Sequence, residues 1–151
     1  DDSAVTSDYI CYDQTGDYLP IDSDLDGDGI PDYWEYLHFD DFTVGKVDDD
    51  ADGDGVTTSG EFQVDSYPTT ADNGLEAKVE PEANTNNLMV MVPRSSVNRL
   101  YTLFESSDMG VNDPWTEVTG AIDIAGNGGD LEFSVIPSLQ KKFYRIKVKV
   151  P

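Results

Sequence analysis

Two twelve-residue segments of the chain repeat one spacing of acidic residues and glycine. Asp24–Glu35 reads DLDGDGIPDYWE and Asp50–Glu61 reads DADGDGVTTSGE. Both place Asp at positions 1, 3 and 5, Gly at position 6 and Glu at position 12. Carboxylates at this spacing repel one another unless a cation lies between them. The repeat therefore restricts the local fold more than any other feature of the sequence.

The spacing predicts two calcium loops. Ca²⁺ takes about six to eight oxygen ligands, and a loop of this kind supplies them from positions 1, 3, 5, 7, 9 and 12. Position 9 binds directly or through a water. The predicted ligands of the first site are Asp24, Asp26, Asp28, the backbone carbonyl of Ile30, Asp32 and Glu35, and those of the second are Asp50, Asp52, Asp54, the carbonyl of Val56, Thr58 and Glu61.

A second register of the loops is possible, because Asp22 and Asp48 could begin each count two residues earlier. That register places Tyr33 and Ser59 at position 12, and both closing glutamates are lost. We therefore reject it. The spacing leaves open whether Asp22 and Asp48 contact an additional or shared ion.

The run from Asp22 to Glu35 resembles the thrombospondin type 3 and dockerin-like calcium repeats of secreted bacterial proteins, and Asp48–Glu61 is similar to the second member of such a pair. The resemblance implies an EF-hand-like pair in which a short helix follows each loop. Dockerins carry recognition residues on two similar helices, whereas the segments after Glu35 and Glu61 differ from each other. Binding to a cohesin is therefore not implied.

The charge of the chain is strongly acidic and unevenly distributed. The formal net charge is -22, and residues 22–61 contain 14 acidic residues and one basic residue. Without metal, we expect this region to unfold locally. So acidic a chain is repelled by nucleic acid and by anionic membranes. No apolar run is long enough to span a membrane.

The compartment that the sequence favours is extracellular, either secreted or on a cell surface. The first residues lack the charged and apolar regions of a signal peptide, which we interpret as a mature or excised fragment. Cys11 is the only cysteine, so an internal disulfide is impossible. We expect a small buried thiol there, with pairing to another chain as the alternative.

The distribution of apolar, acidic and turn-forming residues divides the chain into three regions: an N-terminal strand segment (1–21), the paired calcium loops (22–74) and an antiparallel β-domain (75–151). In the last region, Gly, Pro and Asn separate short apolar runs that we expect to form strands, and residues 143–150 alternate between apolar and basic. The other runs are residues 88–92, 100–104, 115–118, 121–124 and 131–135. The expected fold is mainly β, an antiparallel sandwich or small barrel with a pair of EF-hand-like loops and short helices. Trp34, Leu37 and His38 are expected to form the apolar face of the first helix.

The β-domain also resembles the C-terminal β-domains that follow calcium repeats in large bacterial surface proteins and polysaccharide-degrading enzymes. The similarity lies in residues 99–108, 115–118 and 142–146. This similarity indicates the kind of protein in which such a domain occurs, and it does not indicate an activity.

The sequence contains no convincing catalytic set. His38 is the only histidine, and a packed or surface imidazole is the expected role. Paired carboxylates lack specificity among 31 acidic residues. We therefore expect a protein that is not an enzyme.

Two functions remain. The first is a structural module stiffened by calcium, a subunit of a surface or fibre that self-assembles. The alternative is a carbohydrate-binding or spacer module of a secreted polysaccharide-degrading enzyme. The expected partners are Ca²⁺, polysaccharide, and other copies of the chain through the N-terminal strand near Tyr9–Tyr12 or the basic C-terminal strand near Lys141–Lys149.

Overall fold

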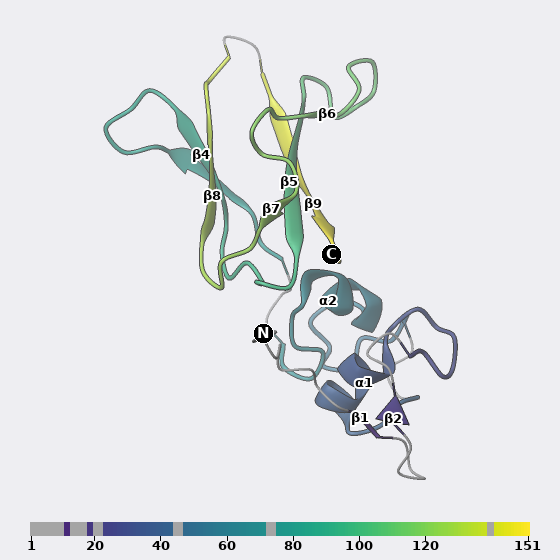
Figure 1. The fold of residues 1–151 in the computed structure, drawn as a ribbon. Helices are drawn as coiled ribbons and strands as arrows, with labels where there is room; N and C mark the ends of the chain where they lie inside the picture. The colour runs from purple at the N-terminus through teal and green to yellow at the C-terminus, as the bar shows by residue number, and fades with distance from the viewer. Residues whose placement is uncertain (1–10, 13–17, 20–22, 44–46, 72–74, 139–140) are drawn as a thin grey trace, which may run out of the picture. The chain divides into compact units, whose positions relative to one another are not determined.

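The computed structural model of the 151-residue chain describes residues 11–12, 18–19, 23–43, 47–71, 75–138 and 141–151. These residues form two short helices and nine strands (Figure 1). The chain divides into two compact units. The first contains Asp1–Phe62 and Tyr67–Asp72, and the second contains Gln63–Ser66 and Asn73–Pro151.

The first unit contains strands β1 (Cys11–Tyr12) and β2 (Tyr18–Leu19), which pair antiparallel. It also contains helix α1 (Asp32–Phe39) and most of helix α2 (Thr58–Val64). The predictions for residues near Tyr9 and for the thiol of Cys11 lie outside what the structure describes.

The residues that flank helix α1 have backbone conformations that suit the start and the end of a helix. Pro31 precedes it with φ -67°, a value that suits a helix entrance. Asp40 ends it in the left-handed conformation, with φ 58°, and its amide donates to the carbonyl of Tyr36 at 3.0 Å. Asp32 and Glu35 lie in the first turn, where acidic side chains suit the helix dipole.

The apolar centre of the first unit is Trp34, which is 1% exposed. Its ring centroid lies 4.4 Å from that of His38 and 5.4 Å from that of Phe62, so aromatic contacts join the segments after the two loops. The prediction that Leu37 shares this buried face is wrong, because Leu37 is 60% exposed. Glu35 is buried, and Leu37, two residues later, lies on the opposite side of the helix from it.

The second unit is built on two antiparallel sheets. The first sheet has the order β3 (Lys78–Pro81), β4 (Leu88–Val92) and β8 (Leu131–Val135). The second is centred on β5 (Leu100–Ser106), with β6 (Thr116–Glu117), β7 (Ile124–Ala125) and β9 (Phe143–Lys149). Because β9 pairs with β5 along all seven residues, β6 and β7 share the other edge of β5.

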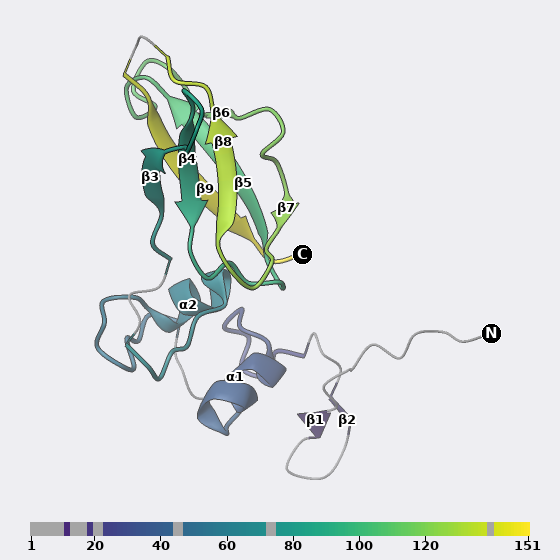
Figure 2. The same cartoon turned by 90° about the vertical axis from the view of Figure 1, so that its left-hand side faces the viewer.

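The core of the second unit lies between the two sheets (Figure 2). Strand β8 alternates between buried and exposed residues, as a strand with one apolar face must. The buried core residues are Val90, Val92, Tyr101, Leu103, Ala121, Leu131, Phe133 and Val135. The prediction of a mainly β, antiparallel protein is confirmed.

Several predicted strands coincide with observed ones. The runs at residues 88–92, 100–104 and 131–135 form β4, β5 and β8, and the alternating run at 143–150 forms β9. Strand β3 was not predicted, because its sequence KVEP lacks an apolar alternation. It forms through its pairing with β4.

Candidate metal centre

The first acidic loop is organised around the carboxylate of Asp24. Its Oδ1 accepts backbone N–H groups from Gly27 at 2.8 Å and from Asp28 at 3.2 Å, and its Oδ2 accepts from Gly29 at 3.0 Å. The amide of Ile30 donates to Asp28 Oδ1 at 2.9 Å. These bonds wrap the backbone around the first acidic residue of the loop.

The second loop repeats this arrangement position by position. Asp50 Oδ1 accepts from Gly53 at 2.8 Å and from Asp54 at 3.1 Å, and Oδ2 accepts from Gly55 at 2.9 Å. The amide of Val56 donates to Asp54 Oδ1 at 2.8 Å. Each distance agrees with its counterpart within 0.1 Å, so the two sequences specify one local structure.

The glycine at position 6 is required by the backbone. Gly29 and Gly55 both have φ +96°, which is strained for a residue with a side chain. A Cβ at either position would meet no atom within 4 Å. The requirement is therefore conformational and does not come from lack of space.

Position 9 joins each loop to its helix. The amides of Asp32 and Thr58 donate at 2.8 Å to the carbonyls of Ser23 and Asp49, the residues immediately before each loop. Asp32 Oδ1 also accepts from the amide of Leu25 at 2.8 Å, and the Thr58 hydroxyl donates to the Asp49 carbonyl at 3.0 Å. Each loop is thus closed by its own backbone.

Closure brings the carboxylates at positions 1, 3 and 5 together. In each loop, one oxygen from each of the three carboxylates lies within 4.8 Å of the others. The two clusters are Asp24, Asp26 and Asp28, and Asp50, Asp52 and Asp54. The crowding raises the pKa of Asp26, through burial first and then through repulsion from Asp28 and Asp24.

The predicted closing ligands, Glu35 and Glu61, are both fully buried at 0% exposure. Neither carboxylate oxygen of Glu35 has a hydrogen-bond partner among the described residues. Burial, followed by repulsion from the four aspartates of its loop, raises the pKa of Glu35 from 4.5 to about 8. A charged group in this position requires a compensating cation.

The donor set fits a hard cation. The groups that meet at each loop are carboxylate oxygens, which suit Ca²⁺ and Mg²⁺ better than metals that prefer sulfur or nitrogen. Ile30 is buried and Val56 half-buried, so their side chains leave the loops for the interior. Asp48 is exposed and lies outside the second cluster, and Asp22 falls outside the described part of the chain.

Sequence reasoning missed the groups that close the loops. The carbonyls of Ser23 and Asp49 precede the motif, so its spacing gives no sign of them. The contact between Trp34 and Phe62 was also missed, although each aromatic residue directly neighbours the closing glutamate of its loop, a signal that could have found it.

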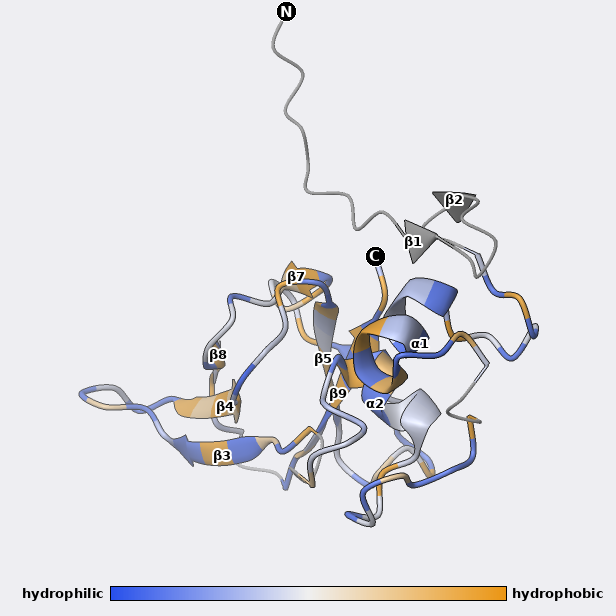
Figure 3. Cartoon of the chain, turned by 90° about the horizontal axis from the view of Figure 1, so that it is seen from below, coloured by the Kyte–Doolittle hydropathy of each residue, from blue (hydrophilic) through white to orange (hydrophobic). Residues whose placement is uncertain are grey.

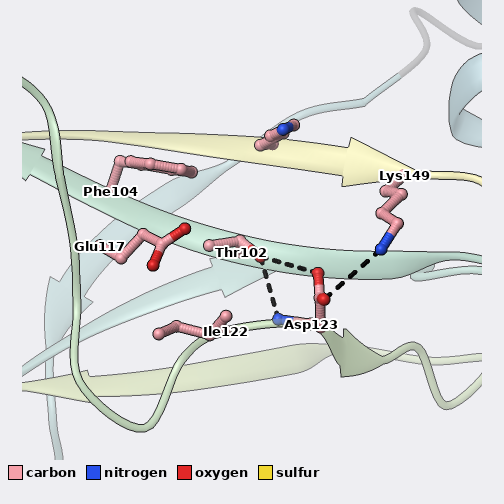
Figure 4. Close-up of a pocket in the computed structure, with 7 residues that line it drawn as sticks. Thr102, Phe104, Glu117, Ile122, Asp123 and Lys149 are labelled. Carbon is pink, nitrogen blue, oxygen red and sulfur yellow. Dashed lines mark hydrogen bonds and ion pairs between the residues drawn. The ribbon is translucent and has the colours of Figure 1, made fainter.

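A second feature is a shallow groove of about 230 Å³ on the β-domain (Figure 4). It is lined by Thr102, Phe104, Glu117, Ile122, Asp123, Lys147 and Lys149. The Lys149 ammonium lies 3.5 Å from Asp123, and the Asp123 amide donates to the Thr102 hydroxyl at 2.9 Å. Among the described residues, Lys147 and Glu117 form no ion pair, so both remain available in the groove.

Comparisons with protein-family models, with curated proteins and with solved structures found no match. The resemblance to thrombospondin type 3 and dockerin-like repeats stays a prediction. Among the described residues, no helix is both long and apolar enough to cross a membrane.

Proposed function

We propose that the chain is a non-enzymatic, calcium-binding structural module of an extracellular protein, with one Ca²⁺ in each acidic loop. The observation that carries the proposal is Glu35, a fully buried carboxylate without a hydrogen-bond partner among the described residues, beside three aspartates with oxygens within 4.8 Å of one another. An isolated buried charge of this kind costs several kcal/mol. A bound dication offsets that cost.

The geometry favours Ca²⁺ over other cations. The acidic groups come from a loop that turns sharply at a glycine in position 6, and Ca²⁺ tolerates irregular coordination, whereas Mg²⁺ requires a near-ideal octahedron and keeps several waters. The proposed ligands are the twelve residues that the loop spacing predicts. In this role, Asp24 and Asp50 also hold the loop backbone in place.

The mechanical consequence of calcium binding is a brace for the first unit. Each ion would tie the start of its loop to the Glu in the helix that follows, Glu35 in α1 and Glu61 in α2. The contact between Trp34 and Phe62 then couples the two braced segments through their side chains. Charge neutralisation at both sites supports the compact form, because residues 22–61 carry 14 acidic residues against one basic residue.

Isothermal titration of calcium into metal-free protein tests this proposal. The expected result is two bound ions, with one lost in the double variant D26N/D28N and the other lost in D52N/D54N. Asp130→Asn, an exposed change in the β-domain, is the matched control and should leave both sites intact. Absence of binding at millimolar calcium, or equal binding by the loop variants, would overturn the proposal.

The groove supports a second candidate function, the binding of a neutral sugar. Its lining contains two acidic and two basic side chains, so its formal charge is zero and it favours neither anions nor cations. Phe104 adds an aromatic surface. The volume of the groove, about 230 Å³, suits a small polar ring better than a drug-sized ligand.

Affinity electrophoresis through gels that contain neutral polysaccharides, with calcium present, tests the second candidate. Retardation that is lost in Glu117→Gln and Lys147→Met, and kept in Glu132→Gln on the other sheet, would support sugar binding. Equal mobility in every gel would exclude it.

A further inference from the structure

Strands β3 and β9, which are edge strands of the two sheets of the β-domain, lie on the same side of the domain. Viewed from below, β3 and β9 lie on one side of the two-layered core, and β7 and β8 lie on the other (Figure 3). Strand β3 pairs only with β4, and β9 pairs only with β5, among the described residues. This side of the domain therefore presents two unpaired strand edges.

The inner face of β3 is left uncovered. Val79 is the direct cross-strand neighbour of Val90, so both side chains lie on the core face of the first sheet. Val90 is 1% exposed, whereas Val79 is 52% exposed. The difference arises because, in the part of the chain that the structure describes, the second sheet stops at β9 and provides no strand opposite β3.

The backbone of β9 has polar groups that point away from β5. The amide of Leu103 donates to Ala121 and its carbonyl accepts from Val118, so neither group is directed at its β9 partner, Ile146. In an antiparallel pair, the N–H and C=O of Ile146 then point outward, as do those of every second residue. These residues are Tyr144, Ile146 and Val148.

A side-chain contact agrees with this assignment. The carbonyl of Val148 accepts a hydrogen bond at 2.9 Å from the side-chain amide of Gln63, which is not a strand neighbour. Among the described residues, the backbone groups of Tyr144 and Ile146 and the amide of Val148 have no strand partner, so another strand can pair with them. Five hydrogen-bonding groups in this geometry are a template for strand addition.

The side chains of β9 separate by character. Tyr144, Ile146 and Val148 face the core but remain only half-buried. Arg145, Lys147 and Lys149 are exposed on the outer face. An added strand that presents apolar residues inward and acidic residues outward would complement both faces.

We infer that a strand from a second copy of this chain adds to β9, and that the strand is the acidic N-terminal segment, residues 1–10. This segment contains three aspartates and no basic residue, proline or glycine. In an extended segment, Val5 and Tyr9 share one face with Asp1 and two serines, and Asp2 and Asp8 share the other with Ala4, Thr6 and Ile10. Val5 and Tyr9 would cover Val79, and Asp2 and Asp8 would lie beside Lys147.

The inference goes beyond calcium binding and uses residues of the β-domain and the N-terminal segment alone. A failure of the calcium titration would therefore not contradict the inference of strand addition. A failure of self-association would likewise leave the calcium proposal intact.

Light scattering across a protein concentration series, with calcium present, is the first test. The full chain should self-associate, and the variant that lacks residues 1–10 should remain a monomer. A synthetic peptide of residues 1–10 should bind to this shortened variant. A full chain that stays monomeric at all concentrations, or association that survives the deletion unchanged, would overturn the inference.

Amide hydrogen exchange locates the contact. The outward N–H groups of Tyr144 and Ile146 should exchange rapidly in the shortened variant and become at least tenfold slower when the peptide is added. The N–H groups of Arg145 and Lys147 point towards β5 and serve as internal controls that are protected in both states. Protection of Tyr144 and Ile146 in a monomeric full chain would show that the segment of the same chain occupies the edge, and would overturn the second-copy assignment.

Charge reversal tests the outer face. Lys147→Glu should weaken peptide binding about fivefold, the scale of an exposed ion pair. Lys78→Glu, on β3 in the other sheet, is the matched control and should have a much smaller effect. Equal weakening by both variants would mean that only overall charge matters, and would count against the placement of the aspartates beside Lys147.

Discussion

Arg99 and Asp65, which are 34 positions apart, form an ion pair in which the side chain of Arg99 is only 2% exposed and its guanidinium lies 3.7 Å from the carboxylate. Arg99 Nε also donates to the carbonyl of Gln63 at 2.9 Å, in the last turn of α2. Asp65 has φ 62°, and its carboxylate accepts from the hydroxyl of Ser96. This network explains why Gln63–Ser66 belongs to the second unit.

Replacement of Arg99 by methionine should destabilise the protein by about 3 kcal/mol, because it leaves the carboxylate and the Gln63 carbonyl without their cationic partner. Urea unfolding of the full chain in calcium measures the change. Lys78→Met removes an exposed cation and should stay within about 0.5 kcal/mol of wild type. Equal effects of the two substitutions would contradict the structural role of Arg99.

Removal of calcium should destabilise the first unit selectively. A site at a hundredfold excess of ligand over its dissociation constant contributes about 2.7 kcal/mol. In the Trp115→Phe variant, Trp34 is the only tryptophan, and its burial makes its fluorescence a probe of this unit. Excess EGTA should lower the Tm reported by Trp34, and an unchanged melting curve would contradict the calcium brace.

Glu35→Gln should have opposite effects with and without calcium. In metal-free protein the substitution removes a buried carboxylate and should stabilise the fold by about 2 kcal/mol. With calcium it removes a charged ligand and should weaken the first site at least tenfold. Chemical unfolding with EGTA and with calcium gives both values, and Glu76→Gln, an exposed change, is the control. The same sign in both conditions would contradict this role.

The loop before β6 should respond to acid through Asp113. A backbone hydrogen bond from Ser107, at 2.8 Å, lowers the pKa of Asp113 below 3.8. Because the folded-state pKa lies below the unfolded value, this stabilisation is present above about pH 3.8 and is lost as the pH falls through the lowered pKa. The indole N–H resonance of Trp115 should titrate with a midpoint below 3.8.

Asp113→Asn is the comparison for that titration. The variant keeps a similar shape but has no carboxyl group to protonate, so the low-pH step in the Trp115 resonance should disappear. A step that persists unchanged in the variant would assign the titration to another group.

The sequence by itself determined the features that depend on neighbouring residues. The spacing from Asp24 to Glu35 specified the turn of the loop, because the hydrogen bonds that wrap the backbone around Asp24 and Asp28 span five residues or fewer. The alternation at residues 143–150 specified β9, because a half-buried strand has a period of two. The predicted acidic clusters are observed in both loops.

Tertiary structure alone decided the features that depend on distant residues. The burial of Glu35, the exposure of Leu37 and the ion pair between Arg99 and Asp65 each depend on which segments meet. Strand β3 and its exposed Val79 depend on where each sheet ends. The physical reason is that local backbone geometry is encoded within a few residues, whereas burial and pairing depend on long-range contacts that no short pattern contains.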